Sequence, residues 1–227
     1  MPRRPTSTQS RPPEKRQGPM APGTTSGRPS SSMPKPVHER LASGPLPEPE
    51  TLARALFSEP ISGKVKILFL DVDGTLTDGV IGYSRETDYR NFWVRDGIAL
   101  QWARDLGVLS VAISGRHSEA VNARMKDLGL EYYGGERDKV AVAQRVLDRE
   151  GARWEECVMV GDDLPDLALM KKVGWPIAVA NAQPEIKLAA KTVLGTYGGR
   201  GAVREMVEMV LRHNGTWDQV LKWYGAT

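Results

Sequence analysis

Three short polar clusters contain the residues whose types and spacing could do chemistry. Each cluster directly follows an apolar run, and its members are Asp71 and Asp73, Ser114, and Asp162 and Asp163. Groups just past the carboxyl ends of parallel strands converge on one crevice, so residues remote in sequence should meet there. Carboxylates crowded into one crevice repel each other, and a hard divalent cation with oxygen ligands relieves that repulsion. The clusters therefore predict a Mg²⁺ site.

Taken singly, each cluster has a simpler interpretation. Asp-x-Asp-Gly after a strand is more often a turn than a catalyst. A calcium loop over 71–82 is not favoured, because its glycine comes at the fourth position instead of the sixth and Gly82 stands where a bidentate glutamate is needed. The sequence has no Gly-rich phosphate loop ending in Lys-Ser/Thr, which disfavours a P-loop nucleotidase. The case for chemistry depends on the clusters occurring together.

The clusters must be positioned by strands and helices that alternate along the chain. Compact apolar runs alternate with amphipathic segments, which is typical of βα units around a parallel sheet. The predicted strands are 65–70, 108–113, 130–133, 157–160 and 177–179, with a hairpin over 80–83 and 89–94. The predicted helices are 50–57, 98–106, 119–128, 139–150, 166–172, 203–211 and 217–224. The expected fold is α/β, Rossmann-like, with a central parallel sheet between two helical layers.

The first 50 residues differ in composition from the rest of the chain. They contain 12 of the 16 prolines, and almost no spaced apolar residues that could line a core. They also hold eight Lys/Arg against four Asp/Glu, so the remainder of the chain is close to neutral. We expect a disordered tail over 1–50 and a folded domain over 51–227. Because the basic excess lies in the tail, nucleic-acid binding by the domain is not expected.

Cysteine use and hydropathy limit the cellular setting. Cys157 is the only cysteine, which excludes an internal disulfide and a Cys-rich zinc site. No apolar run approaches the roughly 20 residues needed to cross a bilayer, and the N-terminus lacks the apolar centre of a secretory signal. These features predict a cytoplasmic protein without membrane insertion.

The order of the motifs resembles the haloacid dehalogenase superfamily over residues 64–212. The matching order is Asp-x-Asp-Gly-Thr, Ser-Gly-Arg, an isolated Lys139, and Gly-Asp-Asp-x-x-Asp. The resemblance implies that Asp71 is a nucleophile that forms an aspartyl phosphate, and that Asp73 is the general acid and base. It implies Mg²⁺ ligation by the side chains of Asp71 and Asp162 and by the backbone carbonyl of Asp73. Ser114 and Lys139 would neutralise the phosphoryl oxygens.

Two further aspartates, Asp163 and Asp166, are expected to anchor waters or Lys139 in this scheme. Many members of the superfamily carry a cap domain inserted after the first or second motif. Here only a hairpin and one helix fit between Asp73 and Ser114, and barely two elements fit between Ser114 and Lys139. The expected type is therefore capless, with the hairpin as a small insertion.

Longer motifs resemble the 3-deoxy-D-manno-octulosonate 8-phosphate phosphatase family. They are Asp-Gly-Thr-Leu-Thr-Asp-Gly, Val-Arg-Asp-Gly, Gly-Asp-Asp-Leu and Gly-Gly-Arg-Gly-Ala-Val-Arg-Glu. Members of that family are capless homotetramers whose substrate site is completed across subunits and by the C-terminal segment. The resemblance implies a homotetramer that hydrolyses a sugar acid phosphate.

Arginines are the expected partners of the carboxylate and phosphate of such a substrate. The resemblance implies substrate binding by Asp73, Arg95, Asp96, Gly97, Ser114, Gly115, Arg116, Arg124 and Lys139. Arg200 is a further candidate that could reach a neighbouring subunit. Trp93 and Ala99 depart from the family pattern close to the expected substrate pocket, so they bear on the identity of the sugar.

Two other functions are compatible with these residues. The first is a phosphatase for a nine-carbon, sialic-acid-type acid 9-phosphate on the same fold. The second is a non-catalytic oligomeric interaction module whose working part is the Arg/Pro-rich tail. The second is disfavoured because a scaffold needs neither Asp71 nor Asp73.

Overall fold

The computed structural model describes residues 61–85 and 88–226. The predicted tail over 1–50, the helix over 50–57 and the start of the domain at residue 51 lie outside the described residues, so they stay predictions. None of the helices in the described part of the chain is long and apolar enough to span a membrane.

A six-stranded, all-parallel sheet forms the centre of the fold, in the order β5-β4-β1-β6-β7-β8. The strands are β1 (Ile67–Leu70), β4 (Leu109–Ser114), β5 (Glu131–Gly134), β6 (Cys157–Gly161), β7 (Trp175–Ala178) and β8 (Thr192–Val193). The central strands are nearly continuous apolar runs because both faces of the sheet are covered, and every residue of β1 is buried. The prediction of an α/β fold with a parallel sheet is confirmed.

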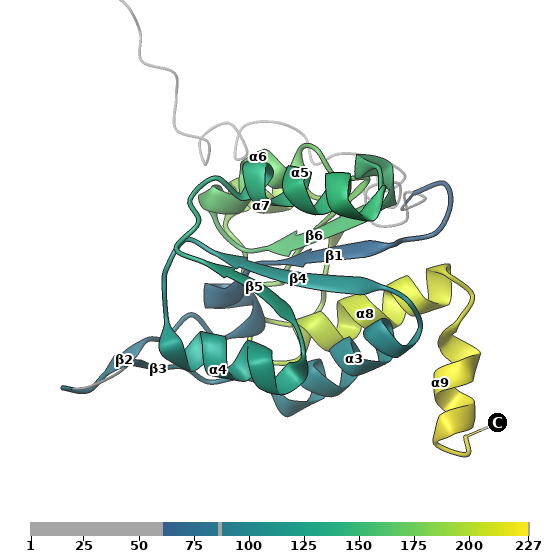
Figure 1. Ribbon diagram of the computed structural model, residues 1–227, viewed down its shortest axis with the longest axis horizontal. Helices are drawn as coiled ribbons and strands as arrows, with labels where there is room; N and C mark the ends of the chain where they lie inside the picture. Colours follow the sequence, from purple (N-terminus) through teal and green to yellow (C-terminus); the bar gives the residue numbers. More distant parts are fainter. Residues whose placement is uncertain (1–60, 86–87, 227) are drawn as a thin grey trace, which may run out of the picture. The chain divides into compact units, whose positions relative to one another are not determined.

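Helices cover both faces of this sheet (Figure 1). One layer holds α5 (Lys139–Glu150), α6 (Leu167–Met170) and α7 (Pro184–Ala189); the other holds α3 (Val94–Asp105), α4 (Glu119–Leu128) and α8 (Ala202–His213). Single 3₁₀ turns at Trp154–Glu156 and Leu164–Asp166 precede β6 and α6. The core lies between the sheet and the two helical layers, as predicted for a three-layer fold.

The last helix, α9 (Trp217–Trp223), packs through aromatic side chains onto α3. The ring of Trp217 meets that of Trp102 edge to face at 5.9 Å between centroids. The indole N–H of Trp102 donates a hydrogen bond to the hydroxyl of Tyr224 at 3.1 Å. These contacts place the C-terminal segment against its own domain.

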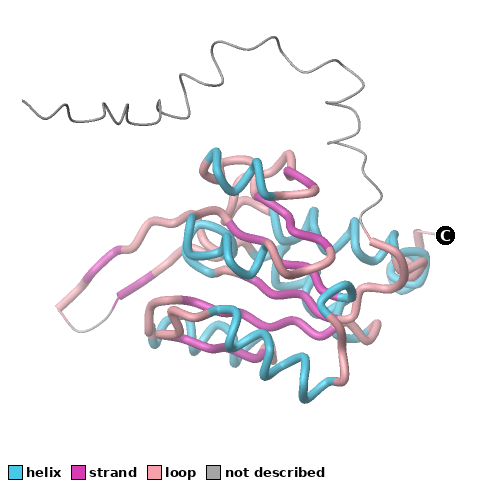
Figure 2. Tube along the Cα trace, turned by 90° about the horizontal axis from the view of Figure 1, so that it is seen from above, coloured by secondary structure: helices cyan, strands magenta, loops and turns pink. Residues whose placement is uncertain are grey.

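A short antiparallel hairpin, β2 (Gly82–Tyr83) with β3 (Asp88–Tyr89), projects from the edge of the domain. Both views show it extending away from the sheet (Figures 1 and 2). It is shorter than the predicted 80–83 and 89–94, because the chain turns into α3 at Val94 and only one bridge, Thr77 with Phe92, extends the pairing. Between Asp73 and β4 the described chain adds only this hairpin and α3, and between Ser114 and Lys139 it adds only α4 and β5, so the capless type is confirmed.

The short elements α7 and β8 were not predicted. Each has few apolar residues, and α7 begins at Pro184, where a proline fits the first helical turn. The predicted helix over 166–172 is also shorter, since a 3₁₀ turn replaces its start.

Chain order reverses at β1, which pairs with β4 on one side and β6 on the other. A crevice opens beyond the carboxyl ends of the strands at such a switch point. The three polar clusters follow β1, β4 and β6, so the fold brings them to this crevice.

Asp96 supplies the N-terminal cap of α8 from a different helix. Gly201 precedes α8 at φ 105° and has no side chain to cap it, and the Asp96 Oδ1 accepts the Arg204 N–H at 2.7 Å. Asp96 is 2% exposed, and its Oδ2 has no hydrogen-bond partner. Burial raises the pKa of Asp96 to about 6, against the lowering effect of the backbone donors at Arg204 and Gly201.

This raised pKa predicts a pH dependence of stability. The folded state holds the Asp96 proton more tightly than the unfolded chain, so the stability from this group is greatest below pH 4 and is lost as the pH rises through about 6. Urea unfolding of the wild type and of Asp96→Asn measures this effect. Between pH 4.5 and pH 7 the wild type should lose about 2 kcal/mol of unfolding free energy relative to Asp96→Asn. A pH-independent difference would contradict the prediction.

Candidate active site

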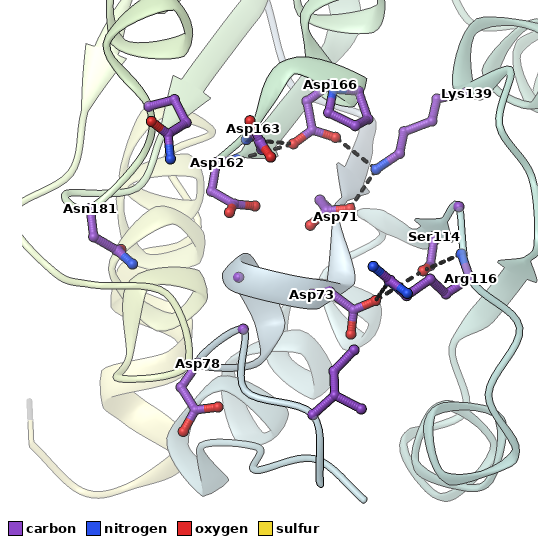
Figure 3. Close-up of a pocket in the computed structure, with 16 residues that line it drawn as sticks. Asp71, Asp73, Asp78, Ser114, Arg116, Lys139, Asp162, Asp163, Asp166 and Asn181 are labelled. Carbon is purple, nitrogen blue, oxygen red and sulfur yellow. Dashed lines mark hydrogen bonds and ion pairs between the residues drawn. The ribbon is translucent and has the colours of Figure 1, made fainter. Parts of the chain in front are cut away.

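A cavity of about 450 Å³ lies at the carboxyl ends of β1, β4 and β6. Figure 3 shows side chains from all three clusters pointing into it. The predicted residues that line it are Asp71, Asp73, Ser114, Gly115, Arg116, Lys139, Asp162, Asp163 and Asp166. The structure therefore brings together the residues that the sequence analysis placed at one crevice.

Lys139 forms buried ion pairs with both Asp71 and Asp166. Lys139 is 3% exposed, and its Nζ donates to Asp71 Oδ1 and, at 2.7 Å, to Asp166 Oδ1. Lys139 is the first residue of α5, which Asp138 caps by accepting the Ala141 N–H at 3.0 Å. Burial lowers the pKa of Lys139, but the charges of Asp71 and Asp166 outweigh it and the net pKa is raised. Lys139 is therefore a fixed cation beside Asp71.

Asp71, Asp162 and Asp166 offer one carboxylate oxygen each within 4.8 Å of one another. Burial and the charge of Asp166 raise the pKa of Asp71 well above its ordinary value, and the same two causes raise that of Asp162 to about 6. Three carboxylates face a single lysine, so the cluster lacks positive charge. A hard divalent cation with oxygen ligands fits this donor set.

Asp166 is already engaged on both oxygens, which separates its role from that of the other two carboxylates. Its Oδ1 binds Lys139, and its Oδ2 accepts the Asp162 N–H at 3.0 Å and the Asp163 N–H at 3.4 Å. This agrees with the expected anchoring of Lys139 by Asp166. Asp71 and Asp162 are left as the side-chain candidates for the metal, as predicted from the resemblance.

Asp73 is held by a buried arginine that the sequence analysis missed. The Arg90 Nε donates to Asp73 Oδ1 at 2.5 Å, and its guanidinium also binds Asp88 and, at 2.7 Å, the Ser118 hydroxyl. The other Asp73 oxygen, Oδ2, lies 3.5 Å from the Ser114 hydroxyl. A charged residue inside a β-prone stretch was the only signal for Arg90. The pairing leaves Oδ2 as the less tightly held oxygen.

Ser114 and Arg116 stand at one side of the cavity, after β4. The Ser114 hydroxyl accepts the Arg116 N–H at 3.1 Å, which fixes the turn, and Arg116 Nε lies 3.9 Å from Asp73 Oδ2. The Arg116 side chain is 64% exposed, so it is accessible to an anionic ligand beside its contact with Asp73. A Cβ added at Gly115 would meet nothing within 4 Å, so this glycine leaves open space beside the cavity.

The cavity has a second side that sequence reasoning did not find. It is lined by Asp78, Ile81, Asn181 and Gln183. Asn181 and Gln183 follow β7, so they lie at the carboxyl end of a fourth strand. Their position after a strand was the available signal, but amide residues in a loop carry no spacing pattern.

Four predicted substrate residues do not line this cavity in the described chain. Arg95 lies exposed on α3, and Asp96 is buried as the α8 cap. Gly97 packs against the guanidinium of Arg124, which pairs with Asp127 at 2.7 Å. Their substrate role stays a prediction that a single chain does not support. Arg200 lies 3.8 Å from Asp78, a residue of the cavity wall.

Comparison with known proteins gives one family. A haloacid dehalogenase-like hydrolase family model matches residues 130–206. The 3-deoxy-D-manno-octulosonate 8-phosphate phosphatase of Haemophilus influenzae is 35% identical over 66% of this chain and 85% of its own length. The protein of the same name from Escherichia coli K12 is 37% identical over 68% of this chain and 84% of its own length.

Solved structures agree with these relatives. One is the 3-deoxy-D-manno-octulosonate 8-phosphate phosphatase of Moraxella catarrhalis in complex with magnesium, phosphate and KDO (3-deoxy-D-manno-octulosonate). It matches with a TM-score of 0.69 and 33% identity, over 70% of this chain and 93% of that one. The cobalt-bound H. influenzae enzyme matches with a TM-score of 0.66 and 34% identity, over 68% of this chain and 91% of that one. The motifs meet at one crevice, and the relatives match over most of their own length. The chain therefore belongs to the 3-deoxy-D-manno-octulosonate 8-phosphate phosphatase family of haloacid dehalogenase-like hydrolases.

Proposed function

We propose that the protein is a Mg²⁺-dependent phosphatase that hydrolyses 3-deoxy-D-manno-octulosonate 8-phosphate to the free sugar acid and phosphate. The observation that carries the proposal is the buried Asp71, which is held by Lys139 and lies beside Asp162 in a cavity with Asp73. The relatives named for this activity support the choice of substrate.

Asp71 acts as the nucleophile. Its carboxylate oxygen attacks phosphorus, and the bond from phosphorus to the C8 oxygen of the sugar acid breaks. Lys139 donates to Asp71 Oδ1 and so fixes the plane of the carboxylate during the attack. The product of this step is an aspartyl phosphate, which divides one difficult hydrolysis into two easier displacements.

Asp73 moves the protons of both displacements. Its Oδ1 is held by Arg90, so Oδ2, which faces the cavity beside Ser114, gives a proton to the leaving alkoxide. The same oxygen then takes a proton from the water that attacks the phosphorus of the aspartyl phosphate. The bond from phosphorus to the Asp71 oxygen breaks, which frees the Asp71 carboxylate and releases phosphate. One group serves as acid and then as base because the second step needs the proton state that the first leaves behind.

Mg²⁺ held by Asp71, Asp162 and the backbone carbonyl of Asp73 would supply positive charge next to the phosphoryl oxygens. Ser114 and Lys139 add donors to the same cavity. Phosphoryl transfer depends mainly on such positioning and charge neutralisation.

The cavity is open, and other copies of the chain are the proposed cover. The proposed assembly is a cytoplasmic homotetramer, with the hairpin as an assembly element. Tyr83 and Tyr89 on the hairpin are 74% and 61% exposed, which leaves apolar surface for a neighbour. Arg95, exposed on α3, would then reach the substrate of a neighbouring subunit.

Phosphate release by the purified full-length protein tests the proposal. We expect turnover of 3-deoxy-D-manno-octulosonate 8-phosphate that EDTA abolishes and added Mg²⁺ restores. Sialic acid 9-phosphate and glucose 6-phosphate should give a lower kcat/KM. A higher kcat/KM with the nine-carbon acid would overturn the substrate and keep the reaction class.

A further inference from the structure

Two consecutive glycines of the Gly-Gly-Arg-Gly motif lie against the backbone of the turn that follows β1. A Cβ added at Gly198 would come within 1.7 Å of the carbonyl oxygen of Gly74. A Cβ added at Gly199 would come within 2.2 Å of the Asp78 backbone nitrogen, and Gly199 adopts a φ of 62°. Only glycine allows two backbones to approach this closely.

Hydrogen bonds join this glycine pair to two walls of the cavity. The Gly199 N–H donates to the Thr75 carbonyl at 2.9 Å. The Gly198 N–H donates to the side-chain oxygen of Asn181 at 2.9 Å. The pair therefore links the turn after β1 to the loop after β7, and Asn181, which Figure 3 shows beside the cavity, completes the link.

The glycine pair is itself fixed from behind. Three residues after Gly199 the chain enters α8, whose first turn is capped by Asp96 and whose apolar face is buried against the core. A rigid helix thus stands behind the contact. Movement of the glycines away from the turn would require α8 to shift.

The turn that the glycines contact carries the proposed metal-binding and proton-transfer groups. Gly74 lies between Gly198 and Asp162: a Cβ added at Gly74 would come within 2.2 Å of an Asp162 carboxylate oxygen. Asp73 directly precedes Gly74. A side chain at position 198 would displace the Gly74 peptide. This would in turn move the Asp73 carbonyl relative to the carboxylate of Asp162.

We propose that Gly198, Gly199 and Asn181 are positioning residues that fix the turn after β1 and thereby set the affinity of the site for its divalent cation. None of the three binds the ion in this scheme: Gly198 and Gly199 lie outside the cavity lining, and Asn181, which lines the cavity, acts through its hydrogen bond from the Gly198 N–H. The inference rests on the proposed function only in taking the ion to be bound at Asp71 and Asp162.

Calorimetric titration of the EDTA-treated full-length protein with Mg²⁺ tests this role, together with kcat and KM. Gly198→Ala should raise the Kd for Mg²⁺ by about 10- to 100-fold and lower kcat by a similar factor, which is typical when a group that orients metal ligands is lost. KM at saturating Mg²⁺ should change much less. The matched control is Gly195→Ala in the same loop, where a Cβ would make only one ordinary contact, at 3.7 Å to Glu205.

Asn181 provides a second test that does not depend on tolerance of a backbone clash. Asn181→Ala removes the acceptor of the Gly198 N–H and should weaken Mg²⁺ binding, whereas Asn181→Asp keeps an acceptor oxygen and should retain it. If Gly198→Ala does not fold, the Asn181 pair decides. A folded Gly198→Ala, or Asn181→Ala, with the Mg²⁺ Kd of Gly195→Ala would overturn the inference. If the wild type binds Mg²⁺ but does not turn over the sugar acid phosphate, the proposed function fails and the comparison of Kd values still decides the positioning role.

Discussion

Asp71→Asn is expected to lower kcat by a factor on the order of 10⁴ or more, as is typical when a covalent nucleophile is removed. The amide has nearly the shape of the carboxylate, so the cavity should stay intact. It cannot form the aspartyl phosphate, and the neighbouring Asp166 cannot take its place, because both oxygens of Asp166 are engaged. Single-turnover assays with saturating Mg²⁺ and substrate measure the loss of the chemical step directly.

The same substitution should not destabilise the metal-free protein. Burial and the neighbouring Asp166 raise the pKa of Asp71 well above its ordinary value, which means that its charged form is unfavourable in the folded state. Removing that charge should leave the melting temperature unchanged or higher without Mg²⁺, and should reduce the stabilisation that Mg²⁺ provides. Asp105→Asn, an exposed carboxylate on α3, is the control. Retention of more than about a tenth of wild-type turnover by Asp71→Asn would contradict the nucleophile role.

Helix ends with capping residues could be predicted from the sequence alone. The helices over 119–128 and 139–150 have the predicted bounds, because each begins after a side chain that accepts a backbone N–H and ends at a left-handed glycine. Ser118 with Gly129, and Asp138 with Gly151, are the four residues concerned. Such local chemistry is visible without knowledge of the fold.

The acidic side of the cavity could also be predicted, because apolar runs followed by polar clusters locate strand ends. Arg90 and Asn181 could not. Arg90 acts through contacts with Asp73 and Ser118, which only the tertiary structure brings near. Asn181 follows a strand of only four residues in a loop without a spacing pattern. Residues that act through such tertiary contacts leave little signal in one sequence.

The Val-Arg-Asp-Gly motif has structural roles within one chain. Its aspartate is predicted to bind substrate, which stays a prediction, and in this chain Asp96 caps α8 and Gly97 gives room to Arg124. Both roles stabilise the packing of α3, α4 and α8, which lie on one face of the sheet. A motif can thus be required for the fold at a position expected to contact a ligand. The exposed Arg95 keeps its predicted role only if a neighbouring subunit supplies the cavity.

Removal of Lys139 is the second change with a large expected effect on stability and turnover, because aspartates surround its charge. Lys139→Ala leaves Asp71 and Asp166 buried without their cation, and loss of one partner from a buried ion pair costs about 3 kcal/mol or more in the free energy of unfolding. It should also lower kcat by about 10²- to 10³-fold, since a donor aimed at developing charge is lost. Lys139→Met, which keeps most of the length without the charge, should show the same losses if charge is the cause.

The pH and metal dependence of this loss separates charge from packing. Without Lys139 the pKa of Asp71 should rise further, so the folded state takes up a proton more readily than the unfolded chain, and the variant regains stability as the pH falls. The stability deficit of Lys139→Ala relative to the wild type should therefore be smaller at pH 5 than at pH 8, and added Mg²⁺ should reduce it at pH 8. Urea unfolding at the two pH values, with EDTA or Mg²⁺, measures both effects. A deficit of the same size under all four conditions would mean that the lysine stem stabilises the site by packing, and that its charge does not balance the carboxylates.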